Sequence, residues 1–206
     1  LTFILVPLDT PGITVRPIEK LNHKKAFAEV FFDDARVPIE NQLGEEGKGW
    51  DVAMATAGFE RGLMLRSPAR FQDTARKLVE LYKQTVASGV YVAPELRDTV
   101  ARCWMDAEAY TLNTYQTVSR LLAGGKIGAE ASLNKIFWSE LDLKMHDTAL
   151  KLLGHRAELL PGAPAAGDVG EWLDGYIFAL AGPIYAGTNE IQRNIIAERI
   201  LGMPRK

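Results

Sequence analysis

The sequence predicts a mainly α-helical protein, in which an antiparallel bundle of four-helix type follows a partial antiparallel β domain. Two patterns support this prediction. Up to about residue 45, short stretches rich in β-branched and aromatic residues alternate with turn signals, which is typical of strands. From about residue 49 onward, apolar residues recur at helical spacing. Long helices with one apolar stripe each pack best as a bundle. We therefore expect a β region over residues 1–45 and a helical bundle over 46–206.

Three short strands are predicted in the β region, over residues 2–8, 13–19 and 26–32. The segments DTPG and NHKK separate them and read as turns. The glycine-rich segment GEEGKG then marks the linker to the helical part.

The helical part is predicted to begin with a helix over about 49–86. Pro68 is the candidate site of a kink, because a proline removes one backbone hydrogen bond and pushes against the carbonyl four residues earlier. The next helix begins at Pro94, a favourable first helical residue, and ends at Gly124 and Gly125. Its predicted apolar face consists of Leu96, Val100, Cys103, Trp104, Ala107 and Tyr110.

Three further helices are predicted. The first spans about 129–153 and ends at Gly154, and its stripe consists of Leu133, Phe137, Leu141, Met145 and Leu152. After the loop PGAPAAGDVG, a short helix spans 171–180. The final helix spans 189–201 and presents Ile191, Ile195, Ile196 and Ile200.

Composition and charge exclude several classes of partner. The 206 residues are 47% hydrophobic and 24% charged, and the formal net charge is −2, so the composition is that of an ordinary soluble protein without the basic face of a nucleic-acid binder. No apolar run approaches the roughly 20 residues of a membrane span. The chain starts with Leu1 and is strand-like at once, so we expect it to begin in the middle of a domain.

Cys103 is the only cysteine, so no disulfide can form within the chain. Its predicted place on an apolar helix face does not favour a reactive thiolate. Both features favour a reducing, cytoplasmic setting.

The histidines do not fit a di-metal site of the kind found in helical bundles. Such a site needs Glu-x-x-His on two helices, so that both ligands face inward. Three residues before the three histidines, His23, His146 and His155, stand Lys20, Leu143 and Leu152. We therefore predict no metal site and interpret the histidines as surface or capping residues.

Glu60 is the strongest candidate for a catalytic acid or base. On the predicted helix its neighbours within roughly 60° are mostly small or apolar: Ala53, Ala57, Leu63 and Met64. Burial of a carboxylate in such a stripe raises its pKa toward the range of a general base. The alternative is a glutamate that turns to solvent or pairs with Arg61 or Lys48. Two glycines inside the helix, Gly58 and Gly62, indicate that another group approaches it closely.

The segment IYAGTNEIQRN, residues 184–194, forms a small-residue turn before the final helix. Thr188 can cap this helix, which leaves backbone N–H groups and the positive end of the helix dipole pointing outward. Ala186 and Gly187 let a flat or bulky group approach the backbone. A capped helix without any ligand is the alternative interpretation.

Together these segments resemble the acyl-CoA dehydrogenase family in order and spacing. The matching segments are PGITVRPIEKL, VFFDDARVPIENQLGEEGKGW, FER at residues 59–61 and IYAGTNEIQRNIIAERILGMPR, of which the last is the most specific. The resemblance covers the whole chain but only about half of a usual member. It implies that residues 1–45 are the second half of the middle β domain, and residues 46–206 the C-terminal helical bundle domain.

The resemblance implies an FAD enzyme that oxidises an acyl-CoA thioester to the 2,3-enoyl-CoA and passes electrons to an electron-transfer flavoprotein. Many members carry the α-proton base where this sequence has Ala186. A smaller branch, similar to isovaleryl-CoA dehydrogenase, places it on the first long helix, at the position of Glu60. Ala186 would still offer its backbone N–H to the thioester carbonyl.

The resemblance assigns the other site residues as follows. Thr188 and Gln192 are similar to residues that line the flavin, and Gly154 is the residue that remains of an adenine-side turn. On the substrate side stand Arg61, Tyr185 and Gly187.

Two segments depart from the family pattern. The family's Arg-x-x-Phe-Gly motif, whose arginine reaches the flavin pyrophosphate of a neighbouring subunit, does not occur in the region KQTVASGVYVAPELRD. The Gln-x-x-Gly-Gly turn is replaced by KLLGH, with Lys151 and His155 as substitutes. The alternative is therefore a non-catalytic structural subunit of a hetero-oligomeric acyl-CoA dehydrogenase. In either case the family implies a homo- or hetero-oligomer, a dimer or tetramer. We expect the 206-residue piece alone to bind little flavin and to be inactive.

Overall fold

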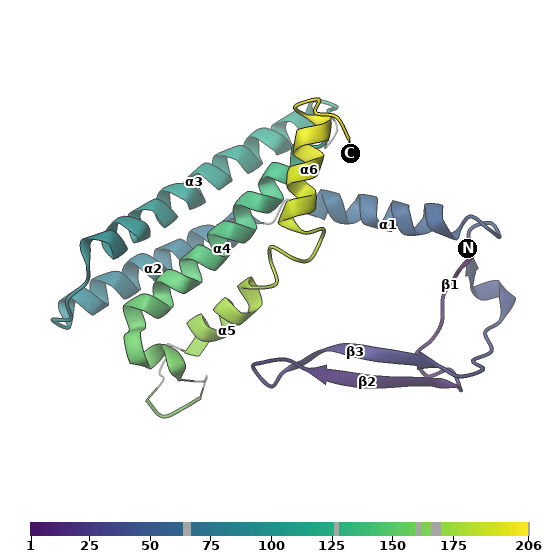
Figure 1. Cartoon of the computed structure of the whole chain (residues 1–206), viewed down its shortest axis with the longest axis horizontal. Helices are drawn as coiled ribbons and strands as arrows, with labels where there is room; N and C mark the ends of the chain where they lie inside the picture. Colours follow the sequence, from purple (N-terminus) through teal and green to yellow (C-terminus); the bar gives the residue numbers. More distant parts are fainter. Residues whose placement is uncertain (64–66, 126–127, 160–161, 166–169, 206) are drawn as a thin grey trace. The chain divides into compact units, whose positions relative to one another are not determined.

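The computed structural model describes residues 1–63, 67–125, 128–159, 162–165 and 170–205, without the side chains of residues 57–63. The chain divides into two compact units, Leu1–Arg61 and Gly62–Lys206 (Figure 1). The first unit contains four short strands and most of one helix, and the second contains five α-helices among the described residues. The predicted domain boundary between residues 45 and 46 is not the boundary of these units, and it stays a prediction.

Two pairs of antiparallel strands form the first unit. Strand β1, Phe3–Ile4, pairs with β4, Gln42–Leu43, and β2, Ile13–Glu19, forms a hairpin with β3, Lys25–Phe32. The second and third predicted strands are confirmed within a residue. The first is shorter than predicted, because its partner β4 is only two residues long and directly follows a 3-10 helix. A short 3-10 helix, Ile39–Asn41, leads to β4, and helix α1, Gly49–Leu63, follows.

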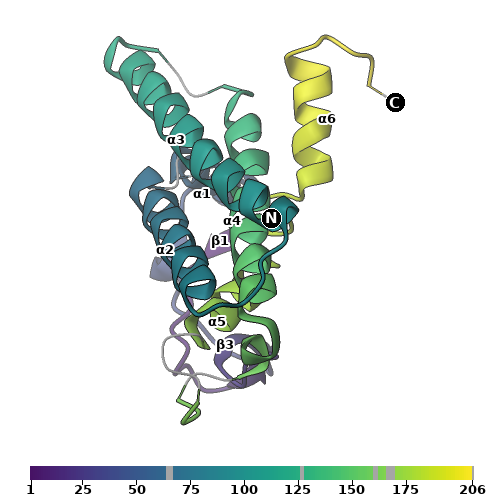
Figure 2. The same ribbon diagram turned by 90° about the vertical axis from the view of Figure 1, so that its left-hand side faces the viewer.

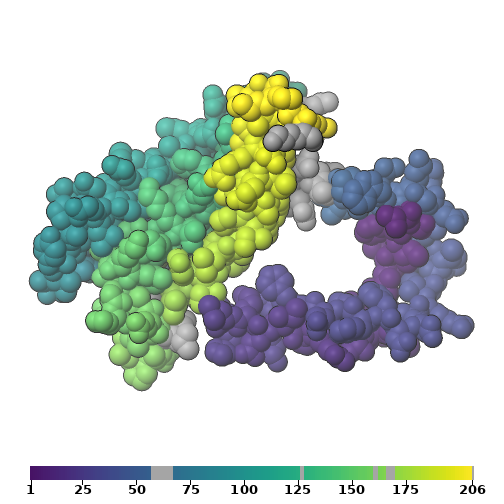
Figure 3. Space-filling view, in the orientation of Figure 1, coloured from purple at the N-terminus to yellow at the C-terminus, as the bar shows by residue number. Residues whose placement is uncertain are grey.

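The β2–β3 hairpin carries one largely apolar face. Alternate residues of a strand share a face, and the register places on this face Ile13, Val15 and Pro17 opposite Phe32, Val30 and Ala28. On the other face Arg16 stands opposite Glu29 and lies over the ring of Phe31, 4.7 Å from its centroid. Every residue of β3 is exposed, which Figure 3 shows for the hairpin in purple. A two-stranded sheet of this kind cannot bury its own apolar face.

Three long helices form the centre of the second unit: α2, Pro68–Ala87, α3, Pro94–Leu122, and α4, Ala131–Leu153. Helices α2 and α3 run antiparallel through a short loop, and α4 packs against both (Figure 2). Helix α5, Gly170–Ala179, packs on α4, as does α6, Asn189–Arg199. The predicted bundle is confirmed.

The prediction of one helix over 49–86 with a kink at Pro68 is wrong. Helix α1 ends at Leu63, and α2 begins at Pro68 as its first residue. Ser67 is extended, with φ −52° and ψ 119°, because a residue before proline is disfavoured in the α region. Proline fits a first helical position, where its missing N–H would have no partner.

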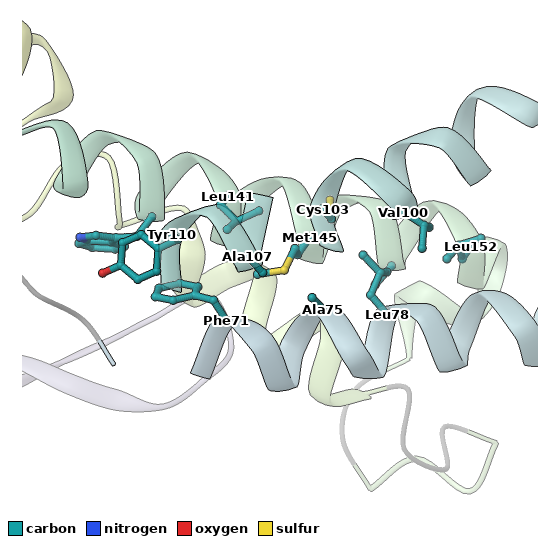
Figure 4. Packing of buried hydrophobic residues seen from close by; sticks show 12 residues of the cluster. Phe71, Ala75, Leu78, Val100, Cys103, Ala107, Tyr110, Leu141, Met145 and Leu152 are labelled. Carbon is teal, nitrogen blue, oxygen red and sulfur yellow. The ribbon is translucent and has the colours of Figure 1, made fainter. Parts of the chain in front are cut away.

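One end of the bundle, here called the apolar end, is filled mainly by hydrophobic side chains (Figure 4), although α4 also buries Asp142, His146 and Thr148 there. It consists of Phe71, Ala75 and Leu78 from α2, Val100, Cys103, Ala107 and Tyr110 from α3, and Leu141, Met145, Ala149 and Leu152 from α4. Phe71 is fully buried and meets the edge of Tyr110 at a centroid distance of 5.1 Å. Burial raises the pKa of the Cys103 thiol to about 11.

The opposite end, here called the polar end, buries hydrogen-bonding side chains. It consists of Thr111, Thr114 and Thr117 from α3, Asn134, Lys135 and Ser139 from α4, and Asn189 from α6. Each of the three threonine hydroxyls donates to the carbonyl four residues earlier, at 2.8 to 3.0 Å. The side-chain amide of Asn113 donates to Oδ1 of Asn134 and so joins α3 to α4.

The predicted apolar faces are wrong in part. Leu133 and Phe137 are 50% and 38% exposed, and Trp104 of α3 is 42% exposed. The other three members of the predicted α4 stripe, Leu141, Met145 and Leu152, are buried. The helix also buries Ala131, Lys135, Trp138, Asp142 and Ala149. Because α2, α3, α5 and α6 all pack against α4, this helix buries a wide face that includes polar residues. In the final helix, Ile191 and Ile200 are also half-exposed. No helix in the described part of the chain is long and apolar enough to span a bilayer.

Candidate functional site

The loop before α6 has an unusual backbone. The N–H of Asn189 donates to the carbonyl of Pro183 at 2.9 Å and closes the segment 183–189 into a turn. Within it, Ala186 and Gly187 have φ values of 54° and 82°, so two successive residues are left-handed. For alanine this conformation is unfavourable, and it persists only where surrounding contacts hold it.

Gln192 of α6 provides such contacts. Its Nε2 donates to the carbonyl of Ala186 at 3.0 Å and to that of Gly187 at 3.4 Å, and its side chain is buried. A Cβ atom at position 187 would lie 2.6 Å from Nε2 of Gln192. Glycine is therefore required at position 187 by its positive φ and by the available space.

Three backbone N–H groups of the turn take no part in these contacts. In the described part of the chain, the N–H groups of Ala186, Gly187 and Thr188 have no hydrogen-bond acceptor, and Ala186 and Gly187 are exposed. The predicted cap is present, since the Thr188 hydroxyl oxygen accepts the N–H of Ile191 at 3.3 Å. Three donors without an acceptor in the described part of the chain therefore lie at the positive end of α6, an arrangement suited to an anion or a polarised carbonyl oxygen.

The ionisation of Glu190 agrees with the positive end of the α6 dipole. The pKa of Glu190, in the first turn of α6, is lowered by hydrogen bonds to its own backbone N–H and to the Thr188 side chain. Negative charge is thus favoured at this end of the helix.

Tyr185 lies within the turn, directly before the left-handed pair Ala186 and Gly187, and packs on the core. Its ring is half-buried, and its centroid lies 5.9 Å from that of Trp138 in α4. The aromatic contact fixes the entry of the chain into the turn.

A buried polar network fixes the start of α6 from the other side. Nζ of Lys135 donates to Oδ1 of Asn189 at 2.7 Å, and Nδ2 of Asn189 donates to Oγ of Ser139 at 3.2 Å and to Oε1 of Glu140 at 3.3 Å. Arg193, one turn further along α6, pairs with Glu140 at 2.5 Å. The sequence interpretation missed this network. Its signal was a lysine placed four residues after Ala131 and three before Trp138, at the spacing of a buried helix face.

Gly154 lies far from the turn. It ends α4 with a φ of 56°, and its N–H donates to the carbonyl of Leu150. At 1.5 Å per residue, the fifteen residues between Ser139 and Gly154 place the two ends about 22 Å apart along α4. Gly154 instead lines a groove of about 610 Å³, together with residues of the loop Val90–Ala93 and with Lys151, His155 and Arg156. The structure does not bring Gly154 together with Thr188.

Two predicted residues cannot be placed. Glu60 and Arg61 belong to the last turn of α1, and their side chains lie outside the described residues. Their roles as base and as CoA contact stay predictions.

His146 corrects the interpretation of the histidines as surface or capping residues. It is buried in α4, its Nδ1 lies 2.8 Å from the carbonyl of Asp142, and its ring meets that of Trp172 at 5.6 Å. A Cβ at Gly175 of α5 would lie 2.3 Å from its Nε2, so the glycine makes room for the imidazole. His23 and His155 are exposed as predicted. Among the described residues, no three His, Cys, Asp or Glu side chains form a group that could hold a metal ion.

Comparison with known proteins relates this architecture to one family. The family described as "Acyl-CoA dehydrogenase, C-terminal domain" matches residues 47–201. Acyl-CoA dehydrogenase IpdE1 of Mycobacterium tuberculosis is 36% identical over 207 residues, with coverage of 100% of this chain and 51% of the relative. The protein of the same name from Mycolicibacterium smegmatis is 37% identical, with coverage of 100% and 50%.

A solved structure agrees with the sequence relatives. The crystal structure of the ChsE4-ChsE5 complex from Mycobacterium tuberculosis is similar with a TM-score of 0.83 and 28% identity, over 100% of this chain and 53% of that chain. The chain thus spans about half the length of the relatives it matches. From the helical bundle, the glycine turn before α6 and these matches, we conclude that the chain belongs to the acyl-CoA dehydrogenase family.

Proposed function

We propose that this chain is the C-terminal half of an enzyme that oxidises an acyl-CoA thioester to the 2,3-enoyl-CoA, with Glu60 as the base that removes the α-proton. One observation carries the proposal: the turn at 186–188 offers backbone donors without an acceptor among the described residues, at the positive end of α6. The α-proton of a thioester becomes acidic enough to remove when its carbonyl oxygen is polarised, which such donors can do.

In this proposal the chain's residues have separate tasks. The N–H of Ala186 donates to the thioester carbonyl oxygen, and the carboxylate of Glu60 takes the proton from the α-carbon. FAD, when bound, supplies the acceptor for the hydride that leaves the β-carbon, so that the carbon–carbon double bond forms. Tyr185 and Gly187 border the substrate, Arg61 contacts its CoA part, and an electron-transfer flavoprotein removes the electrons.

The residues near the turn fit a flavin in shape. Thr188 and the exposed Gly187 present a small surface at a helix N-terminus, where a flat ring can approach the backbone. Gln192, assigned to the flavin by resemblance, already donates its amide hydrogens to the turn. We therefore assign Gln192 the task of shaping the surface against which the ring would lie.

The test is Glu60→Gln in the full-length protein. Loss of a general base should lower kcat by about 10²–10⁴-fold. Flavin absorbance should persist, because the change is isosteric. The matched control is Glu46→Gln, an exposed acid of the same unit, which should keep normal turnover. Near-normal kcat in Glu60→Gln would remove Glu60 from this role.

A second candidate is a subunit that keeps the fold but does not catalyse, within a hetero-oligomer. The groove at Gly154 favours it: the loop Val90–Ala93 contributes Val90, Tyr91 and Val92 to the lining, and the expected arginine is absent from that segment. The ChsE4-ChsE5 structure is itself that of a complex. Purified full-length protein with a flavin band that an acyl-CoA bleaches supports the enzyme. Colourless full-length protein that only pairs with another chain supports the alternative.

A further inference from the structure

Lys135 is a buried cation without a task in the proposed reaction. Its side chain is 0% exposed, and the Oδ1 atom of a neutral residue, Asn189, is its hydrogen-bond acceptor. It forms no ion pair with a carboxylate of the described residues. Burial lowers the pKa of Lys135, while Glu190 and Glu140 oppose the shift and Arg193 adds to it. An ammonium group beside one neutral amide is costly to bury, so stability alone is a poor reason for a lysine here.

The acceptor of this lysine occupies a critical position. Asn189 is the first residue of α6, and its own N–H closes the turn on the carbonyl of Pro183. Its side chain is held by Lys135 and by Ser139, both on α4. One residue therefore ties the closing bond of the turn to the central helix of the bundle.

The turn needs such an anchor. Ala186 keeps an unfavourable positive φ, and Gln192 holds only its carbonyl side. If the first residue of α6 moved, the carbonyl groups of Ala186 and Gly187 would lose their hydrogen bonds to Gln192, and the backbone of the turn would no longer be held. Rigid support from a second layer is what keeps donors aimed at a reacting atom.

We propose that Lys135 is a positioning residue, which acts through Asn189 to hold the turn 183–189 in the conformation that leaves the N–H groups of 186–188 available. The purpose of the turn rests on the proposed function. The hold of Lys135 on the turn does not, and it can be measured without turnover.

The experiment compares Lys135→Met with Lys144→Met in the full-length protein by amide hydrogen exchange. Lys144 lies on the same helix, half-exposed, and pairs with Asp106, so it is a matched control. The probe amides are those of Asn189 and Ile191, which donate to Pro183 and Thr188. Loss of a charged hydrogen bond should speed their exchange by about tenfold or more in Lys135→Met. Amides of the apolar end, such as Leu78, should not change, and Lys144→Met should behave as the unaltered protein.

Unchanged exchange at both probe amides in Lys135→Met, or equal acceleration in Lys144→Met, would overturn the proposal. If Lys135→Met does not fold, the double variant Lys135→Met/Asn189→Leu replaces both partners by apolar groups and leaves no buried donor unpaired. The same acceleration at Ile191 is expected there, and its absence would count equally against the proposal.

Kinetics separate this inference from the proposed function. In an active full-length protein, Lys135→Met should lower kcat about tenfold or more, with a smaller change in KM and an unchanged flavin spectrum, because the donors are misdirected rather than removed. If the unaltered full-length protein has no turnover but Lys135→Met still speeds exchange at Asn189 and Ile191, the proposed function is refuted and the positioning role of Lys135 stands. If Lys135→Met keeps normal turnover and normal exchange at these amides, the positioning role of Lys135 is refuted and the proposed function stands.

Discussion

At the apolar end of the bundle, α2, α3 and α4 meet around Phe71 and Met145, both 0% exposed, whereas at the polar end α3, α4 and α6 meet through threonine, asparagine, serine and one lysine. Apolar contacts are non-directional, so the first end contributes free energy of folding with little demand on angles. Hydrogen bonds are directional, and each buried polar group needs its partner. The polar end lies beside the turn at 186–188, where direction matters. The difference suggests a division between a region that stabilises the fold and one that aims backbone donors.

Phe71→Ala should have the largest effect on stability, because it removes a fully buried aromatic ring from the apolar end. We expect the free energy of unfolding to fall by about 3–5 kcal/mol. Equilibrium urea unfolding measures it, with Phe178→Ala as the control, since Phe178 is 48% exposed. If both variants lost the same stability, the apolar end would not be the main source of it.

The reactivity of Cys103 tests whether the apolar end excludes water. With a pKa of about 11 in place of the ordinary 9.0, its thiolate fraction at pH 8 is roughly 100-fold smaller in the folded protein than in the unfolded one. Alkylation by iodoacetamide should be slower by at least that factor without urea than with it. A cysteine placed on the exposed side of α3, in Cys103→Ala/Ser119→Cys, should react at similar rates in both conditions. Rapid alkylation of folded protein at Cys103 would show that water enters the apolar end.

The raised pKa of Cys103 also determines in which direction stability changes with pH. Between pH 9 and 11 the unfolded state releases the thiol proton while the folded state keeps it, so the folded state binds more protons. Stability from this group is unaffected below pH 9 and falls as the pH rises through that window. Cys103→Ala should remove this part of the alkaline loss, which urea titrations at pH 8 and pH 10 would detect.

Thr188→Ala should have the smallest effect, confined to the polar end. Loss of the cap bond to Ile191 should cost about 1 kcal/mol, and because α6 is the last helix we expect local fraying more than global unfolding. Circular dichroism and urea unfolding should change little, while the amides at the start of α6 exchange faster. Thr188→Ser keeps the hydroxyl oxygen and should restore protection.

Features that depend on neighbouring residues could be predicted from the sequence. Pro94 at a helix start, the glycines after α3 and the Thr188 cap follow from local backbone chemistry, and the structure has them. Features that depend on packing could not. The expected stripe through Leu133 and Phe137 assumed one neighbour for α4, but four helices surround it, so the buried face is wider and shifted toward Lys135.

The candidate site divides in the same way. The small residues of the turn indicated a backbone that another group can approach, and its left-handed pair at 186 and 187 agrees with that. The role of Gln192 could not be read locally, because its partners are carbonyl groups whose direction depends on the turn. The role of Asn189 depends on α4, about 50 residues earlier in the chain. Glu60 stays a prediction from residue spacing and resemblance.

The hairpin β2–β3 has a practical consequence for anyone who handles these 206 residues by themselves. It presents an exposed apolar side and two strand edges that pair with no other strand among the described residues. Such surfaces are the usual starting point for aggregation between identical molecules. We expect light scattering of such a preparation to rise with concentration, whereas a version trimmed to begin at Gly47 should stay monodisperse for longer. Storage conditions and tag placement should therefore be chosen to protect the first 32 residues.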